Sequence, residues 1–194
     1  MATFGKLTNG AGSSSSSTGR KRVSAATPST SGTLTKLTGR FWLNAAGSTN
    51  VRGVVYSSTA GSPDALLATG DEVTITHEAE QEVDLPFSGG QQLALVGGTE
   101  YFIGWIHDDP GTPSVSHSRD STASLGPTNT DTYSDGPSDP FGTVDAQTGP
   151  IDCYGTYTEA SGSDVKSVGD LAIASVKTKN GLAVASVKTF NGLA

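Results

Sequence analysis

The chain has 194 residues, which is enough for one ordinary domain with additional terminal segments. It contains 25 glycines and only 7% aromatic residues, a composition that favours turns and strands over long helices. The formal net charge of −7 argues against nucleic acid as a general partner. The single cysteine, Cys153, excludes an internal disulfide, and no apolar run is long enough for membrane insertion.

Residues 1–22 predict an extended N-terminal arm. They include Gly10-Ala11-Gly12 and a run of serines at 13–17, a low-complexity stretch with little to bury, so we expect it to be mobile on its own. The stretch has no apolar signal core, so Sec-type export is not expected. Arg20-Lys21-Arg22 follows as a compact basic cluster. It predicts a solvated patch, with an anionic docking surface as the alternative.

Several short segments between turn-rich stretches read as strands, which indicates an all-β domain over residues 23–160. The domain is predicted to be a β-sandwich or jelly roll. The expected strands are residues 33–43, 51–57, 71–78, 82–87, 99–106 and 151–158. Alternation places Val73 and Ile75 inward. It also gives shared strand faces to three further sets of residues: Phe41 and Leu43 on either side of Trp42; Val83, Leu85 and Phe87; and Ile151, Cys153, Gly155 and Tyr157.

Residues 99–106 are apolar on both faces, which predicts a central, fully buried strand with Trp105 in the core. Residues 63–67 suggest a helical turn. Residues 108–150 are rich in Pro, Gly, Asp, Ser and Thr and predict a long loop region, where we expect a surface site to lie.

Residues 162–194 repeat an 11-residue phrase three times, as GSDVKSVGDLA, IASVKTKNGLA and VASVKTFNGLA. An 11-residue period also suits a right-handed coiled coil. However, Asn180-Gly181 and Asn191-Gly192 are strong hairpin signals, and they favour strands. The first copy has Gly169-Asp170 at this position, so we expect it to turn differently and to join the sandwich to the repeats.

A hairpin closed at Asn180-Gly181 would pair residues 171–179 with residues 182–190. Neither face of it is bulky enough to form a core, and an isolated hairpin is marginal in water. We therefore expect the repeats to drive assembly, as a flat hairpin array or as a trimeric β-prism. The alternative is a solvated, flexible tail. The candidate oligomerisation residues are Leu171, Ala174, Val176, Leu182, Ala185, Val187 and Phe190.

No catalytic motif is found. His77, His107 and His117 are present, but no serine lies in a G-x-S-x-G elbow, and Cys153 lies in a predicted strand as a buried, inert thiol. The aspartates of the loop region have no spacing that defines a glycosidase pair. Asp131, Asp135 and Asp139 lie in one segment and could gather a calcium ion, but they do not match an EF-hand loop. We therefore predict a non-enzymatic protein with no cofactor and no assigned metal.

Glycan binding is the alternative function, and the segment DTYSDGPSDPFG at 131–142 is its candidate site. Tyr133 and Phe141 could stack on a sugar ring while Asp135 and Asp139 bond its hydroxyls. In the competing interpretation, the two aromatic residues pin this loop to the sandwich.

A set of segments resembles virion proteins of bacteriophages: ATFGK before a serine run, RGVVYSSTAGSPDALLATGDEV, TEYFIGW, DTYSDGPSDPFG and YGTYTE, together with the terminal VKTxNGLA repeats. The resemblance is to tail-associated, minor tail or decoration proteins with a sandwich like that of carbohydrate-binding modules. It implies a structural component of the virion, exposed on the released particle. Its implied partners are other virion proteins, further copies of itself as a homotrimer, and a host-surface glycan. It implies no fixed catalytic set, and it leaves tail and capsid locations open.

Overall fold

The structure is a computed structural model that describes residues 1–16, 18–108, 111–121 and 126–160, together with four short strands within 161–194. The chain divides into two compact units, Met1–Ala160 and Ser161–Ala194. In the described part, helical structure is limited to two 3-10 turns, η1 (Gly89–Gln91) and η2 (Tyr133–Asp135). No described helix is long and apolar enough to cross a membrane.

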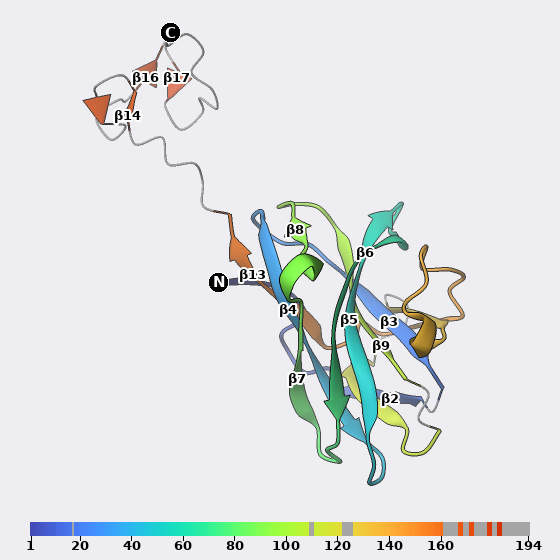
Figure 1. Cartoon of the computed structure of the whole chain (residues 1–194). Helices are drawn as coiled ribbons and strands as arrows, with labels where there is room; N and C mark the ends of the chain where they lie inside the picture. The colour runs from blue at the N-terminus through green and yellow to red at the C-terminus, as the bar shows by residue number, and fades with distance from the viewer. Residues whose placement is uncertain are drawn as a thin grey trace. The chain divides into compact units, whose positions relative to one another are not determined.

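The first unit is a sandwich of two antiparallel sheets, and the all-β prediction is confirmed (Figure 1). Its strands are β1 (Ala2–Gly5), β2 (Gly12–Ser16), β3 (Arg20–Ala26), β4 (Gly32–Leu43), β5 (Thr49–Thr59), β6 (Ser62–Ile75), β7 (Gln81–Pro86), β8 (Ala94–Leu95), β9 (Tyr101–His107), β10 (Val115–Arg119), β11 (Gly126–Thr130), β12 (Ala146–Thr148) and β13 (Cys153–Glu159).

The first sheet is built around the long strand β4. Along one edge, β4 pairs first with β13 and then with β10. β13 pairs in turn with β1, and β10 pairs with β2. The other edge of β4 pairs with β7 and β8. The second sheet has the order β12-β11-β3-β9-β5-β6. All of these pairings are antiparallel, so neither sheet needs helical crossovers.

The main core fills the space between the two sheets. Phe41 and Trp105 meet there edge to face, with ring centroids 4.5 Å apart. Val73 and Val83 are partly buried against this core. Ile75, Trp105 and Cys153 are buried in this core, as predicted. Residues that were predicted to share strand faces are buried there as well: Phe41, Leu43, Leu85, Phe87, Ile151 and Tyr157.

The imperfect alternation of β4 has a structural cause. The pairing with β13 passes from Lys36 directly to Leu34, so Thr35 is the extra residue of a β-bulge. The bulge turns both Leu34 and Leu37 into the core, where each is 0% exposed. A strict period of two would have placed these leucines on opposite faces.

The expectation of a separate N-terminal arm is wrong for the described residues. β1 pairs with β13 and places Phe4 in the core at 4% exposure. β2, made of Gly12 and four serines, pairs with β10 as an edge strand. An edge strand needs backbone N–H and C=O groups rather than apolar side chains, so low-complexity sequence can complete a sheet.

The region 108–150 is also more ordered than its composition predicts. It contributes β10, β11, β12 and η2. The suggested helical turn at 63–67 is likewise wrong, because these residues belong to β6, which pairs along β5. In each case cross-strand pairing overrides a weak local preference.

A second apolar cluster covers the outer face of the second sheet. The seven residues of β9, which lies between β3 and β5, are all buried, as the prediction for residues 99–106 required. Alternate residues of β9 face the main core and this second cluster. We call the second group the outer cluster: Val23, Val54, Tyr56, Phe102, Ile106, Tyr133 and Phe141.

The space between the sheets is polar around β10 and the first half of β3. His107 and His117 are each 1% exposed, and the His117 ring packs edge to face on Trp105 at 5.4 Å. Burial, followed by repulsion from Arg22, lowers the pKa of His107 to about 4, although its bond to a backbone carbonyl opposes this shift. The same two causes hold the pKa of His117 well below its ordinary value. Both rings are therefore neutral in the folded protein at neutral pH.

The C-terminal unit contains two short antiparallel pairs. β14 (Ser167–Val168) pairs with β15 (Leu171–Ala172), and β16 (Thr178–Lys179) pairs with β17 (Leu182–Ala183). Lys179 opposes Leu182, which is the predicted register. Val168 opposes Leu171 in the same way, so the first copy keeps this strand register, while its expected different turn at 169–170 lies outside the described residues. The pairing recurs at the repeat period.

The buried histidines predict a loss of stability in mild acid. In the unfolded chain a histidine protonates near its ordinary pKa of about 6.5, whereas the folded protein resists protonation until a much lower pH. The free energy of unfolding should therefore fall from pH 6.5 downwards, by up to about 1.4 kcal/mol per pH unit for each histidine. Urea denaturation at a series of pH values between 7.5 and 5 measures this slope. A H107Q/H117F variant with an unchanged slope would contradict the assignment.

Candidate functional site

The candidate site is the segment 131–145, here called the outer loop, which crosses the outer face of the second sheet. Phe141 is 0% exposed and packs edge to face on Tyr56 at 5.1 Å. Tyr133, at 8% exposure, belongs to the same outer cluster. Both aromatic rings therefore face the sheet.

A buried lysine anchors the outer loop. The Nζ of Lys21 is 2.9 Å from Oδ2 of Asp131 and donates to the carbonyl oxygen of Phe141 at 2.8 Å. It also donates to Oγ of Ser138 and lies 4.7 Å from the centroid of the Phe141 ring. One ammonium group thus contacts both the beginning and the middle of the loop.

This arrangement corrects the expectation of a solvated basic patch at residues 20–22. Lys21 is 0% exposed and Arg22 is 4% exposed, and they lie on opposite faces of β3. Strand alternation sends Lys21 beneath the outer loop and Arg22 between the sheets. Lys21 is therefore separated in space from Arg20 and Arg22, although the three cations are adjacent in sequence.

Burial and pairing act in opposite directions on the Lys21–Asp131 pair. Burial lowers the pKa of Lys21, and the Asp131 carboxylate opposes that shift. Burial alone would raise the pKa of Asp131, but the backbone N–H of Ser138, donating at 2.8 Å, and the ammonium of Lys21 outweigh it and bring the pKa below its usual value. The carboxylate is therefore stabilised in its charged form.

Tyr133 ties the loop to the strands β5 and β6. Its hydroxyl donates to Oε2 of Glu72 at 2.9 Å and accepts from Nε of Arg52 at 3.2 Å. The guanidinium of Arg52 lies 5.3 Å from the Tyr133 ring centroid and pairs with Glu72 at 3.1 Å. Burial, together with the Glu72 hydrogen bond, raises the pKa of this phenol.

The other loop carboxylates also make local bonds. Oδ1 of Asp139 accepts from the backbone N–H of Leu66 at 3.0 Å, and Oδ1 of Asp135 accepts from Ser134 at 3.2 Å. Within the part of the chain that the structure describes, no three His, Cys, Asp or Glu side chains form a group that could hold a metal.

These positions alter the predicted glycan site. Phe141 has no ring face available to a sugar, and Tyr133 has almost none, so stacking on the pair is wrong for this structure. The competing interpretation, in which the aromatic residues pin the loop, describes what is observed. The physical reason is that the outer face of β9 is apolar, so its exposure to water is unfavourable and the aromatic residues of the loop bury it. The roles of Asp135 and Asp139 toward a ligand stay predictions.

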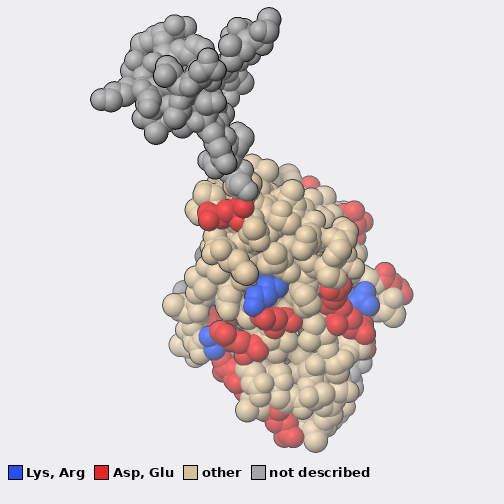
Figure 2. Space-filling model, turned by 60° about the vertical axis from the view of Figure 1, so that its left-hand side comes forward, with Lys and Arg blue, Asp and Glu red and all other residues tan. Residues whose placement is uncertain are grey.

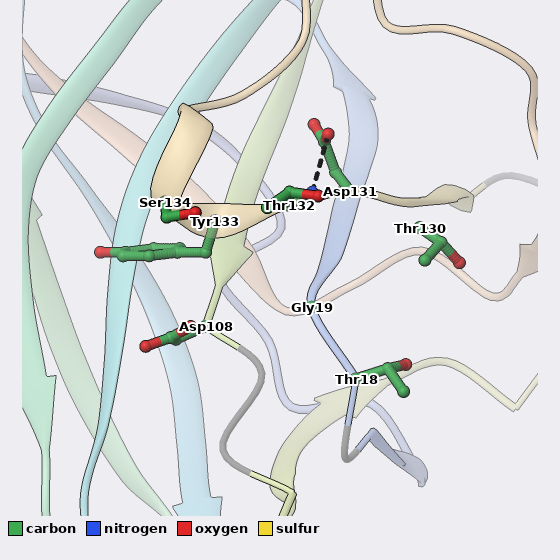
Figure 3. A pocket seen from close by; sticks show the side chains of 8 residues that line it. All are labelled: Thr18, Gly19, Asp108, Thr130, Asp131, Thr132, Tyr133 and Ser134. Atoms are coloured by element: carbon green, nitrogen blue, oxygen red, sulfur yellow. Dashed lines mark hydrogen bonds between the residues drawn. The ribbon is translucent and has the colours of Figure 1, made fainter.

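A groove of about 540 Å³ lies beside the outer loop (Figure 3). Tyr133 and Asp108 lie on one side of it, and Thr18 and Thr130 lie on the other. Its described lining offers hydroxyls, carboxylates and one phenol, but neither histidine nor cysteine: Thr18, Gly19, Asp108, Thr130, Asp131, Thr132, Tyr133 and Ser134. This lining can form hydrogen bonds, but it does not form a nucleophile–base pair.

Cys153, His107 and His77 carry side chains that could serve nucleophilic chemistry, but each is buried or hydrogen-bonded within the fold. Cys153 is 2% exposed, and burial raises the pKa of its thiol, which confirms the predicted inert cysteine. Nδ1 of His107 donates to the carbonyl oxygen of Asp108 at 2.7 Å, and Nε2 of His77 donates to that of Phe41 at 2.9 Å.

Most of the candidate oligomerisation residues lie outside the described residues: Ala174, Val176, Ala185, Val187 and Phe190. Leu171 and Leu182 begin β15 and β17, where the strand pairing is described and the side chains are not.

Comparison with models of protein families and with curated protein sequences finds no match to this chain. The site is therefore interpreted from its own geometry.

The lysine anchor predicts a large effect from a single neutral substitution. Lys21→Met leaves Asp131 without its cation and should lower the free energy of unfolding by about 3–5 kcal/mol, as expected when one partner of a buried pair is removed. Lys21→Met combined with Asp131→Asn should recover part of the loss. Urea denaturation measures both variants.

Lys36→Met is the matched control, because Lys36 pairs with Asp84 at 2.6 Å on the surface. Its cost should stay within about 1 kcal/mol. Equal costs for the two lysine variants would contradict an anchoring role for Lys21.

Proposed function

We propose that this chain is a non-catalytic structural component of a bacteriophage particle, of the tail-associated or decoration type. It assembles through its C-terminal repeats with other copies, as a homotrimer, and with other virion proteins. The observation that carries the proposal is the recurrence of one hairpin register in successive repeats, in a unit separate from the sandwich.

An isolated hairpin has no pairing partners for its outer edges. Each pair, β14 with β15 and β16 with β17, is described as a two-stranded sheet of its own. A two-stranded sheet leaves two edges unpaired and is marginal in water, and at least three strands with an apolar face are needed for independent stability. Strands from neighbouring chains can pair with these edges and bury the apolar face.

The sandwich supports a scaffold role rather than a catalytic one. The outer loop uses its aromatic residues and Asp131 to cover and bond the second sheet. Cys153 is buried within the core. The segments that resemble phage virion proteins, including residues 131–142 and the terminal repeats, favour placement of such a scaffold on a particle.

Disruption of the two predicted Asn-Gly turns should abolish assembly. These turns are predicted to need positive φ, which a β-branched residue strongly disfavours. The Gly181→Val/Gly192→Val variant should therefore lose the repeat structure. We expect light scattering after size exclusion to give a trimer mass for the native chain and a monomer mass for this variant. The melting temperature of the sandwich should be unchanged.

Ser175→Val/Ser186→Val is the matched control, since it adds the same side chains away from the turns, and it should keep the trimer mass. A monomeric native chain would overturn the assembly proposal. Mass spectrometry of purified particles tests the virion proposal separately, and absence of the chain from them would overturn it.

A further inference from the structure

Most cations of the sandwich have an acidic partner. Figure 2 shows one face on which each basic side chain in view lies beside acidic ones. Five of the lysines and arginines in the described residues form ion pairs: Lys6, Lys21, Lys36, Arg40 and Arg52. Arg20, Arg22 and Arg119 form none with the described carboxylates. In a chain of net charge −7, three such arginines are unexpected.

Arg22 is the most constrained of the three. It lies opposite Trp105 in the pairing of β3 with β9, is 4% exposed, and its Nε has no hydrogen-bond partner among the described residues. A buried cation without a partner destabilises the folded state, because the charge has lost its hydration and gained no counter-charge. Such a cost is commonly kept where it serves binding.

Arg22 lines a polar cavity of about 540 Å³. The walls come from β2, β3, the end of β4 and the segment before β10, and their side chains are almost all hydroxyls, amides and arginines. The lining residues are Ser15, Ser16, Thr18, Arg20, Arg22, Asn44, Gly111, Thr112 and Ser114. A polar lining of this kind suits a hydrophilic ligand and would leave an apolar one poorly solvated.

The surroundings of Arg22 add positive charge and hydrogen-bond donors. Burial, and then repulsion from Arg20 and Arg119, lowers the pKa of Arg22 to about 10. The Ser, Thr and Asn side chains of the lining add hydroxyl and amide donors. The cavity therefore presents donors and cations, and the group that complements them is an oxyanion.

We propose that the Arg22 cavity binds an acidic saccharide, with the sugar carboxylate against the guanidinium of Arg22 and the sugar hydroxyls against the Ser, Thr and Asn side chains. A guanidinium can hold a carboxylate through two parallel N–H···O bonds. Arg20 adds a second cation to the same wall. This site shares Thr18 with the groove beside the outer loop, and it does not depend on assembly through the repeats.

The test uses the full chain, with glucuronate as the probe, glucose as the neutral probe and sulfate as the inorganic anion. Isothermal titration calorimetry should detect glucuronate binding and no glucose binding. Arg22→Gln should weaken glucuronate binding about tenfold or more, because it removes hydrogen bonds to a charged group. Arg20→Gln should weaken it by a smaller factor.

Arg40→Gln is the matched control, because Arg40 pairs with Glu82 at 2.6 Å on another strand, and it should bind glucuronate as the native chain does. Since the native Arg22 is buried without an ion-pair partner among the described residues, Arg22→Gln should keep or raise the melting temperature of the ligand-free protein. That result shows that lost binding is not lost folding.

Three outcomes would overturn the proposal. The first is glucuronate binding that is unchanged in Arg22→Gln, and the second is glucose binding as strong as that of glucuronate. The third is sulfate binding that equals or exceeds glucuronate binding, which would make the cavity a site for inorganic anions. All three leave the light-scattering mass unaffected, so they are separate from the proposed function.

Discussion

The ammonium group of Lys21 is buried between the second sheet and the outer loop, where it meets Asp131, Ser138 and Phe141. The rest of this face depends on it, because β9 is apolar on both sides and would otherwise expose Phe102 and Ile106 to water. Tyr133 and Phe141 of the loop bury apolar surface against these strands, and Lys21 fixes the loop at Asp131, Ser138 and Phe141. An ion pair with several hydrogen bonds supplies the missing specificity.

The same strand, β3, places a second cation, Arg22, on its other face, and the two cations have opposite surroundings. Lys21 has a carboxylate, a hydroxyl and a carbonyl as partners, whereas Arg22 meets two further arginines and neutral histidines. The first environment stabilises the fold. The second carries an energetic cost that an incoming anion would offset, so the two neighbouring residues have different roles despite similar chemistry.

Backbone pairing accounts for structure where side chains offer little. The serines of β2 complete an edge of the first sheet through pairing with β10, and the repeats pair in one register in each of two successive copies. In the sandwich this pairing is supported by a core. For the repeats the structure describes the strand pairing alone, and the proposed function gives them to assembly with other chains.

The sequence by itself determined the all-β class, the core-facing residues of the alternating strands, the burial of Trp105 and Cys153, and the register at Asn180-Gly181, because these follow from local periodicity and turn chemistry. Only the tertiary structure decided the rest. It placed the serine run in a sheet, buried Phe141 instead of exposing it, and separated Lys21 from Arg22. Each of these depends on which distant strand or loop lies opposite, and such long-range pairing leaves no mark in a local sequence window.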